Sequence, residues 1–577
     1  MWHKIDNWFK DKTGQDIVLI AIILIFLAGM VPLAATRVID SGHLERYYTD
    51  GALSMLQSND FLSPYGDAKL RLYKPPLLYW LLIAGYKLLG VSFFSSRIWS
   101  LSASCATIWL AYKLALKLTN DIRVARTTAL ILLSNLIVIS IAARSTLDAL
   151  LTFGLFVSAY GFIRLICFNE TQPSAYWAAY AGAAIGIATK GLLPILFVAY
   201  ALVFAFFTSS PEKPFRRVLN PGIILASILI ACSWVVLMFW KHGTFFLRSF
   251  WYDQIGQTID PTGKKYLYPS GFLESNSVAR ISGYFLVYIL VLSPWLLCLA
   301  YLFYKHKPKT NSAFPQLRAC LFIVIWALFL QFVFGLGLSL AIRYLLPAIP
   351  ALAVVLSIGL CQFSNSNIAE IADRLLGFVI AWFFAVCIFG LSILWQNGLL
   401  TKHFAGPTIL LLALLFVVLQ FQKQQLSSQA VLSVSLFFIL PLSLAIASPF
   451  TLPDQTGQIA SALQQLNPEK KPVFVIATSK VTSRLRVSSG AEYPIHEATV
   501  ADFLRDRTRP GPEQSIFVLT ENEARQPPLD SLPLRDVSVI PSGISLPKLF
   551  RATLKGNAKA YIDSRRRHCY ALLPASS

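Results

Sequence analysis

The sequence predicts an α-helical protein that crosses a membrane many times and ends in a small soluble α/β domain. Of its 577 residues, 55% are hydrophobic and only 14% are charged, whereas soluble domains carry about a quarter charged residues. The mean hydropathy is +0.59, and apolar runs of about 20 residues, the length of a membrane-spanning helix, recur along the chain. Beyond residue 450 the sequence becomes charged and strand-like.

The apolar runs predict thirteen membrane spans. The first lies at 17–37 and is interpreted as uncleaved, because no small-residue cleavage site follows it cleanly. The other predicted spans lie at 96–117, 127–143, 149–167, 176–189, 192–208, 220–240, 281–304, 318–338, 344–363, 374–395, 407–422 and 429–448.

The charges in the loops between these spans predict the orientation of the chain. A net charge of +21 would suit nucleic acid, but the basic residues gather in short loops at 113–126, 213–217 and 305–318, as the positive-inside rule predicts. These loops are therefore assigned to the cytoplasm, and nucleic acid is not expected as a partner. The N-terminus is then cytoplasmic, and thirteen spans put the C-terminal tail on the outer face.

The predicted domains are a transmembrane domain at 1–450 and a soluble α/β domain at 451–577, which contains the strand-like runs PVFVIAT and QSIFVLT on either side of the helical ATVADFLRDR. Two outer loops are long. The loop at 38–95 carries a helical pattern in SGHLERYYTDGALSML and a predicted interfacial helix in PPLLYWLLIAGYKLLG, whose prolines suit a first turn. The polar, aromatic loop at 241–280 suits a mobile lid. The eight cysteines form no CxxC pair and are interpreted as small apolar residues.

Several ionisable residues fall at the outer ends of the predicted spans, where such groups are costly and often functional. They are Asp40, Glu45, Lys74, Arg97, Asp148, Lys190 and Arg343. Structural roles remain open for five of them. Lys74 would extend to the lipid headgroups, and Asp148 would cap the helix that it begins. Arg97 and Lys190 would act as topological anchors, and Glu45 would pair with its neighbour Arg46 on the surface.

Four segments carry a resemblance to a known family. MLQSNDFLSPYGDAKLRLYKPPLLYW resembles the signature of membrane glycosyltransferases of the protein O-mannosyltransferase family, which are of the GT-C type and use polyprenyl-phosphate sugars. ARSTLDALLTF, IATKGLLPILF and AIRYLLPAIPAL resemble further elements of that family, in the same order along the chain. Thirteen spans and a periplasmic α/β tail are similar to its lipid A aminoarabinose transferase branch.

The resemblance implies an inverting sugar transfer at the periplasmic face of a bacterial inner membrane. The donor would be an undecaprenyl-phosphate sugar, and the acceptor lipid A or another cell-envelope glycolipid or glycan. A protein O-glycosyltransferase with the same donor is an alternative, as is a transporter or flippase of a polyprenyl-linked lipid. The chain shows no convincing internal repeat, and its charges gather at one face, which favours chemistry at the surface over transport.

The resemblance also implies site residues. The catalytic acids would be Asp40, Glu45 and Asp148. Contacts to the donor phosphate or the substrate would come from Lys74, Arg343, Tyr344, Arg97, Lys190 and Tyr73. In the family an Asp-Glu pair precedes the methionine of ML by eleven and ten residues, and here those positions hold Leu44 and Glu45. Asp40 lies about one helical turn upstream and is the first candidate for the missing acid, with Glu45 second and Asp50 third.

Comparison of the KPP motif with the aminoarabinose branch does not predict a complete metal site. The aminoarabinose branch has a glutamate before the lysine of the KPP motif, and this glutamate belongs to a metal site together with a loop histidine. Here the position holds Tyr73, and the loop at 241–280 offers one histidine, His242. No metal ligands are therefore assigned, and a divalent metal remains possible. Lysine and arginine side chains are expected to stabilise the leaving phosphate without a metal.

Overall fold

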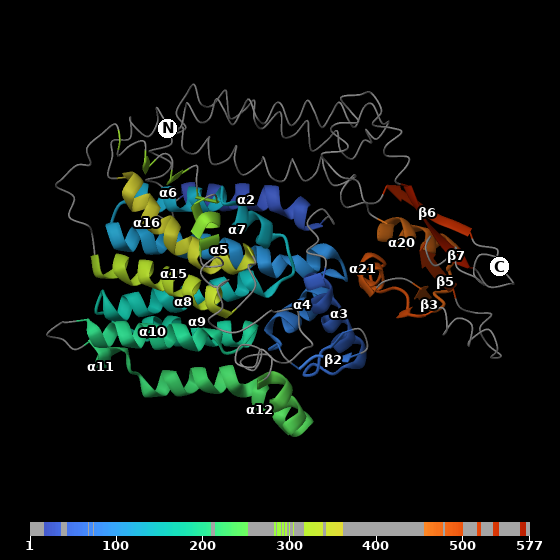
Figure 1. Cartoon of the computed structure of the whole chain (residues 1–577), viewed down its shortest axis with the longest axis horizontal. Coiled ribbons are helices and arrows are strands. Elements are labelled where there is room, and N and C mark those ends of the chain that lie inside the picture. Colours follow the sequence, from blue (N-terminus) through green and yellow to red (C-terminus); the bar gives the residue numbers. More distant parts are fainter. Residues whose placement is uncertain are drawn as a thin grey trace.

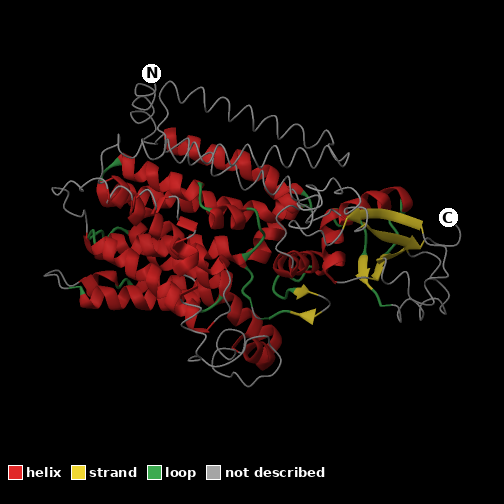
Figure 2. Ribbon diagram, turned by 45° about the horizontal axis from the view of Figure 1, so that its top comes forward, coloured by secondary structure: helices red, strands yellow, loops and turns green. Residues whose placement is uncertain are grey.

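The structure is a computed structural model in which long helices lie side by side and a β-sheet stands at one end of the molecule (Figures 1 and 2). The described residues are 17–35, 43–66, 69–72, 74–208, 214–251, short helical pieces between 282 and 304, 317–337, 342–361, 455–476, 479–499, 516–520, 535–541 and 566–572. The predicted spans at 374–395, 407–422 and 429–448 lie outside them, as does the predicted domain boundary near 450.

The bundle is built from helices, most of which are long and apolar. In chain order they are α2 (Ile17–Ala35), α5 (Phe93–Thr119), α6 (Ile122–Leu133), α7 (Leu136–Ala142), α8 (Leu147–Ile166), α9 (Pro173–Lys190), α10 (Leu193–Phe207), α11 (Pro214–Val218), α12 (Pro221–Trp251), α15 (Leu317–Gly337), the 3₁₀ helix η2 (Ile342–Ala348) and α16 (Ile349–Cys361). Among the described residues, four helices are long and apolar enough to cross a membrane, or five if a bent pair is one span. The chain is thus a multi-pass membrane protein.

The predicted span at 127–143 is in fact two helices, α6 and α7, that meet at 62°. The break lies at Asn135, whose Oδ1 accepts hydrogen bonds from the backbone N–H groups of Ile137 at 3.0 Å and Val138 at 3.3 Å. An asparagine side chain that bonds backbone N–H groups in this way starts a new helix. The bend redirects the chain into the short loop that precedes α8.

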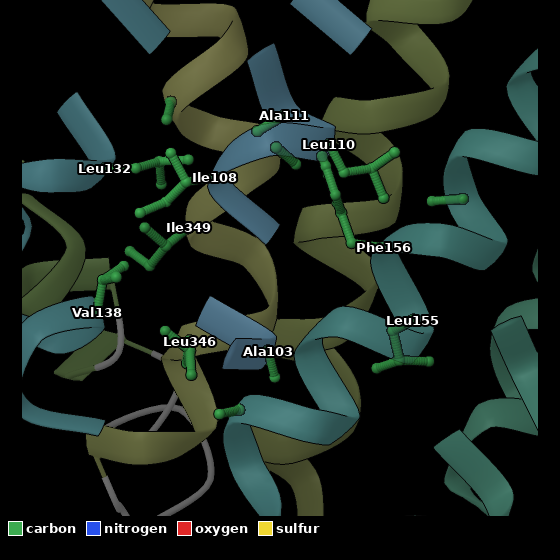
Figure 3. Close-up of a cluster of buried hydrophobic side chains, with 14 of the residues drawn as sticks. Ala103, Ile108, Leu110, Ala111, Leu132, Val138, Leu155, Phe156, Leu346 and Ile349 are labelled. Carbon is green, nitrogen blue, oxygen red and sulfur yellow. The ribbon is translucent and has the colours of Figure 1, made fainter. Parts of the chain in front are cut away.

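The core of the bundle is apolar and closely packed. Figure 3 shows Ile108 of α5, Leu132 of α6 and Ile349 of α16 gathered where these three helices meet. Helices α8 and α9 approach most closely at glycines, because a Cβ placed on Gly161 would lie 2.1 Å from the backbone nitrogen of Ala179. Small residues at helix crossings allow this approach inside a membrane.

The first outer loop contains two helices, as the sequence predicted. They are α3 (His43–Ser58) and α4 (Leu77–Leu89), separated by the short strands β1 (Tyr65–Gly66) and β2 (Lys69–Leu70). The two helices are in close contact at Gly51, where an added Cβ would lie 2.4 Å from Cε1 of Tyr79. The rings of Tyr48 and Tyr79 lie 5.8 Å apart between them.

The loop between α3 and β1 is attached to the end of α12. Lys241 forms an ion pair with Asp60, the Oγ of Ser63 lies 2.8 Å from Nε2 of His242, and the indole N–H of Trp234 donates to the carbonyl of Leu62 at 3.1 Å. These contacts fix the loop against the bundle.

The C-terminal region forms a five-stranded mixed sheet with two described helices. Its elements are α20 (Gln455–Leu466), β3 (Val473–Ile476), α21 (Ser479–Ser488), β4 (Ile495–Glu497), β5 (Ile516–Thr520), β6 (Arg535–Pro541) and β7 (Arg566–Leu572). The strand order is β4-β3-β5-β7-β6, and β3 pairs in parallel with both β4 and β5. The strands predicted in PVFVIAT and QSIFVLT are present as β3 and β5, whereas the helix predicted in ATVADFLRDR lies outside the described residues.

Helix α21 of this region contacts α3 of the first outer loop, and the two are neighbours in Figure 1. Nη1 of Arg486 lies 3.7 Å from Oδ1 of Asp50, and Val487 is buried in the same apolar cluster as the bundle helices. Asp50 is only 4% exposed. Its contact with Arg486 supports a role in joining the two parts of the chain.

This contact gives a prediction for stability. In a double-mutant cycle with Asp50→Asn and Arg486→Ala, we expect a coupling free energy of roughly 0.5–3 kcal/mol, as measured for residues in direct contact. The cycle is to be measured by unfolding the full-length protein in detergent. As a control, Arg486→Ala combined with Asp121→Asn should be additive to within about 0.5 kcal/mol, since Asp121 lies beyond the far end of α5. Additivity of the Asp50 pair would show that the contact does not join the two regions.

Candidate functional site

Asp148 lies in the first turn of α8, and its carboxylate is almost completely buried. It is 4% exposed, and it follows Thr146, which is the N-cap residue of the helix. A carboxylate in the first turn is favoured by the positive end of the helix dipole. The alternative that Asp148 only caps the helix is wrong, because its carboxylate makes ion pairs with two other elements.

Two cations reach Asp148 from helices that are distant in the sequence. Nζ of Lys190, the last residue of α9, lies 3.0 Å from Oδ1, and Nε of Arg343, in η2, lies 3.8 Å from Oδ2. All three side chains are wholly or largely buried. Lys190 is therefore more than a topological anchor, and the structure brings together three of the residues predicted from the sequence.

Tyr344 lies beside these two cations. Nζ of Lys190 is 4.4 Å from the centre of its ring, and the guanidinium of Arg343 is 4.8 Å from it. Nη2 of Arg343 also donates to the Tyr344 hydroxyl at 3.3 Å. Cations over an aromatic face are stabilised when they are withdrawn from water, so the ring holds both positive charges at the edge of the apolar bundle.

Tyr48 of α3 faces the same group, although the sequence indicated it only as part of the apolar side of its helix. Burial raises the pKa of its hydroxyl well above the usual value, and the charges of Tyr79 and Asp148 raise it further. Tyr48 thus stays protonated at physiological pH and is available as a hydrogen-bond donor. No sequence motif singled it out, because it looks like an ordinary packing residue of an amphipathic helix.

Glu45 and Arg97 form a second ion pair at the same end of the bundle. Nε and Nη2 of Arg97 donate to the two carboxylate oxygens of Glu45 at 2.9 and 3.0 Å. Arg97 is completely buried, with 0% exposure, and its Nη1 also donates to the carbonyl of Ala34 in α2 at 3.2 Å. Glu45 thus pairs with a buried arginine rather than with Arg46, and Arg97 does more than anchor the topology.

The backbone of the loop before α8 is attached to this pair. The N–H of Ser145 donates to Oε1 of Glu45 at 2.6 Å, so the carboxylate accepts three hydrogen bonds from groups that are themselves buried. This arrangement does not suit the general-base role predicted for Glu45, since both of its oxygens are already engaged. It suits a structural role, in which Glu45 links α3, α5 and the loop that leads to Asp148.

The structure gives less information on the other predicted site residues, which are Lys74, Asp40 and Tyr73. Lys74 is separated from the start of α4 by two prolines, and its side chain is partly buried. Helix α4, which begins three residues after Lys74, carries Tyr79, whose ring lies near that of Tyr48. Asp40 and Tyr73 lie outside the described residues, and their predicted roles stay predictions.

A second residue of the cluster, in addition to Tyr48, was missed in the sequence. Arg144 lies in the loop between α7 and α8, four residues before Asp148, and the charges of Glu45, Arg97, Arg343 and Asp148 all act on its guanidinium. The motif ARSTLDALLTF contains it, but only the acidic residue of this motif, Asp148, was considered as a site residue. Hydropathy placed it correctly between the predicted spans at 127–143 and 149–167, but gave no reason to assign it to the site.

A separate ionic group lies at the opposite ends of the same helices. Glu170, in the turn between α8 and α9, accepts hydrogen bonds from Lys117 and from Nε of Arg164, the latter at 2.7 Å. Lys117 is near the end of α5, whereas Arg97 is near its beginning. The described ionic side chains are thus sorted between two ends of the bundle, as the loop charges predicted, and the cluster around Asp148 belongs to one end.

The described residues do not provide a set of metal ligands at this end. His242 bonds to Ser63 on the side of α12, and no group of three or more histidine, cysteine, aspartate or glutamate side chains suited to a metal occurs among the described residues. The Asp148 carboxylate is already matched to Lys190 and Arg343. The side chains around Asp148 are therefore better suited to binding an anion than a metal cation.

Comparison with known proteins identifies the fold. Residues 73–240 match the family model described as dolichyl-phosphate-mannose-protein mannosyltransferase. An "Uncharacterized protein" of Aquifex aeolicus is 25% identical over 330 residues, which is 56% of this chain and 59% of that protein. The undecaprenyl phosphate-alpha-4-amino-4-deoxy-L-arabinose arabinosyl transferase 1 of Proteus mirabilis is 26% identical over 320 residues, 54% of this chain and 53% of that protein. The chain thus matches little more than half the length of these relatives.

A solved structure extends the likeness to nearly the whole chain. The crystal structure of ArnT from Cupriavidus metallidurans bound to undecaprenyl phosphate superposes with a TM-score of 0.64 at 18% identity, over 97% of this chain and 98% of that one. At this identity the likeness concerns the fold. The resemblance found in the sequence is confirmed, and the chain has the GT-C fold of membrane glycosyltransferases, near the aminoarabinose transferase branch.

Proposed function

We propose that the protein transfers a sugar from a polyprenyl-phosphate donor, of the undecaprenyl class, to an acceptor of the cell envelope. The observation that carries this proposal is the cation-rich cluster on Asp148, at one end of a bundle with the ArnT fold. A polyprenyl-phosphate sugar is an apolar chain joined to a phosphate, and it needs positive charge where an apolar bundle meets water. Lys190, Arg343 and the aromatic Tyr344 supply that combination.

The net positive charge of the cluster is better matched to the phosphate product than to the donor. Among the described residues whose ion pairs and charges join this cluster, four cations face two carboxylates, an excess of two positive charges. The cations are Arg97, Arg144, Lys190 and Arg343, and the acids are Glu45 and Asp148. A sugar phosphodiester carries one negative charge, whereas the phosphate monoester that leaves carries about 1.5–2 at pH 7. The cluster therefore stabilises the charge that grows as the glycosidic bond breaks.

The chemical step follows from these charges. An oxygen of the acceptor attacks the anomeric carbon of the sugar, and the bond from that carbon to the phosphate oxygen breaks with its electron pair going to the phosphate. The configuration at the carbon is inverted. If the acceptor is a hydroxyl, its proton passes to a carboxylate acting as general base. An acceptor that is itself a phosphate scarcely needs a base.

Each predicted residue except Arg97, which pairs with Glu45, then has a proposed role. Lys190 and Arg343 contact the donor phosphate, and Lys74 joins them from the start of α4. Asp148 holds the two cations in place and orients the acceptor. Asp40 is proposed as the general base, because Glu45 is engaged by Arg97 and Ser145. Tyr73 and Tyr344 lie along the path of the donor in this proposal.

We further propose that transfer does not require a divalent metal, since fixed cations take its place. Removal of metals with EDTA is expected to leave the initial rate within about twofold of the untreated enzyme, because the charge on the phosphate is matched by lysine and arginine. The rate is measured by formation of polyprenyl phosphate in detergent. A loss of activity that Mg²⁺, Mn²⁺ or Zn²⁺ restores would place a metal in the reaction and contradict this part of the proposal.

The proposed setting is the bacterial inner membrane. The N-terminus lies in the cytoplasm, thirteen spans follow, and the C-terminal α/β region and the Asp148 cluster lie on the periplasmic side. The sorting of ionic side chains between the two ends of α5 and α8 supports this orientation. A cysteine introduced near Arg248 should react with an impermeant thiol reagent in intact spheroplasts if it is correct.

The acceptor is proposed to be lipid A or another envelope glycolipid or glycan, in keeping with the arabinosyl transferases that the chain resembles. The family description favours a protein acceptor as the second candidate. A flippase is less well supported, because the ionic side chains lie at the helix ends rather than at mid-membrane. Mass spectrometry of lipid A, envelope glycans and envelope proteins, from cells with and without the gene, tests these proposals. One class of molecule should gain the mass of one sugar, and identical spectra under conditions of proven expression would oppose the function.

A further inference from the structure

Three consecutive polar residues in the loop before α8 have buried side-chain atoms without a partner. These atoms are Nε of Arg144, Oγ of Ser145 and Oγ1 of Thr146, and none of them has a hydrogen-bond partner within the structure as described. Ser145 is 0% exposed and Thr146 is 2% exposed. Buried polar atoms are nearly always paired, and each exception costs about 1–3 kcal/mol. Three in a row therefore require an explanation.

The loop of residues 144–146 does not change its backbone to satisfy these atoms. Its backbone is fixed, because the N–H of Ser145 donates to Glu45 at 2.6 Å and the N–H of Thr146 donates to the carbonyl of Arg144 at 3.0 Å. Thr146 is the N-cap residue of α8, yet its hydroxyl makes no capping hydrogen bond. Most N-cap threonines satisfy a backbone N–H of the first turn. Here both the hydroxyl and the first N–H groups of a 20-residue helix are left for another partner.

Arg144 differs from the other arginines of the cluster. Arg97 has Glu45 and Arg343 has Asp148 as ion-pair partners, whereas no ion pair of Arg144 occurs within the described residues. Burial lowers the pKa of its guanidinium, and the nearby Glu45 and Asp148 do not offset this effect. The two carboxylates are neutralised by other cations. Arg144 is thus a largely buried positive charge with anions near it but none bound to it.

We propose that residues 144–146 form a binding site for the phosphate of the lipid-linked donor. Arg144 is its charged ligand, and the hydroxyls of Ser145 and Thr146, with the first N–H groups of α8, are its neutral donors. A phosphate monoester offers three oxygens that accept such bonds, and a helix N-terminus favours negative charge. The proposal rests on the proposed function. It adds a second set of phosphate ligands to Lys190 and Arg343, and this set directly precedes α8 in the sequence.

The proposal makes a distinctive prediction for Thr146→Val, which removes the hydroxyl at nearly constant shape. Removing an unpaired buried hydroxyl should leave the thermal stability of the ligand-free protein unchanged or raise it. Binding of polyprenyl phosphate should weaken by roughly two- to tenfold, because one neutral hydrogen bond is lost. A hydroxyl with a purely structural role would give the opposite result, a lower stability with unchanged binding.

Arg144→Ala should weaken binding of the phosphate by roughly ten- to a hundredfold, and Arg144→Lys, which keeps the charge without the planar set of donors, should recover part of it. Arg248→Ala, an exposed arginine at the end of α12, is the matched control and should bind as the wild type does. The probes are a short-chain polyprenyl phosphate and inorganic phosphate, titrated against the full-length protein in nanodiscs with thermal unfolding as a check on folding.

The outcomes separate the two proposals. If the wild type binds neither probe, the proposed function fails. If the wild type binds and the three variants bind equally well, only the site at 144–146 is refuted. Preference for the polyprenyl phosphate over inorganic phosphate by the wild type identifies a lipid-linked ligand. Equal binding of both probes, weakened equally by Arg144→Ala, would keep the phosphate site and remove its link to the lipid.

Discussion

Asp148→Asn is expected to lower the rate of sugar transfer by about 10²- to 10³-fold, the loss found when one preorganised electrostatic group is removed from an active site. The carboxylate holds Nζ of Lys190 at 3.0 Å and faces Nε of Arg343 at 3.8 Å. Without its charge the two cations repel each other and leave the geometry in which they meet the donor phosphate. The rate is measured as polyprenyl phosphate released per mole of folded protein.

Asp121→Asn is the matched control for this variant. Asp121 also accepts hydrogen bonds from an arginine, Arg123, and it caps α6 by bonding the Arg123 N–H at 2.8 Å. It follows α5 directly, and that 27-residue helix spans about 40 Å from the end that carries Arg97. We expect Asp121→Asn to retain transfer within about twofold. If Asp148→Asn did so too, at equal amounts of folded protein, the cluster would not be the active site.

Arg97→Met is expected to destabilise the protein by about 3–5 kcal/mol, the usual effect of removing one partner of a buried ion pair. Arg97 is fully buried and donates twice to Glu45, so the substitution removes a buried ion-pair partner of this carboxylate. The double variant Arg97→Met with Glu45→Leu should recover much of the stability. It should remain inactive, because Ser145 loses its acceptor and the loop at 144–146 is no longer fixed.

Unfolding in detergent, followed together with transfer activity, checks this prediction. Lys117→Met serves as the comparison, since Lys117 and Glu170 are each about a quarter exposed and such pairs contribute about 1 kcal/mol or less. A double variant that is both stable and fully active would show that the Glu45–Arg97 pair does not support the site. A single variant as stable as the wild type would contradict the assigned burial of the pair.

The sequence predicted much of this arrangement because membrane proteins impose strong patterns. Long apolar runs located α5, α8, α9 and α15 to within a few residues, and the helices of the first outer loop followed from periodicity and from the prolines before α4. The place of Asp148, Lys190 and Arg343 at the same ends of the predicted spans permitted their convergence, and the family resemblance added Tyr344. Hydropathy and loop charge predict on which side of the membrane each span end lies, because successive spans cross the membrane in opposite directions.

Other features depend on tertiary contacts that leave no local pattern. The break at Asn135 was missed, since a single polar residue in an apolar run does not mark a 62° bend. The structural alternative considered for Glu45 was a surface pair with its neighbour Arg46, whereas the structure pairs it with Arg97, 52 residues away in the sequence. Tyr48 and Arg144 were passed over because packing alone decides that their polar atoms face the cluster. The docking of α21 on α3 was likewise invisible in the sequence.

The most direct test of the central claim is a cryo-electron microscopy structure of the full-length protein with undecaprenyl phosphate in a nanodisc. The phosphate is predicted at hydrogen-bonding distance, about 2.7–3.2 Å, from nitrogens of Lys190 or Arg343 and of Arg144, with the isoprenoid chain leading away beside Tyr344. A phosphate bound at any other place on the protein, with the Asp148 cluster unchanged and empty, would contradict the account.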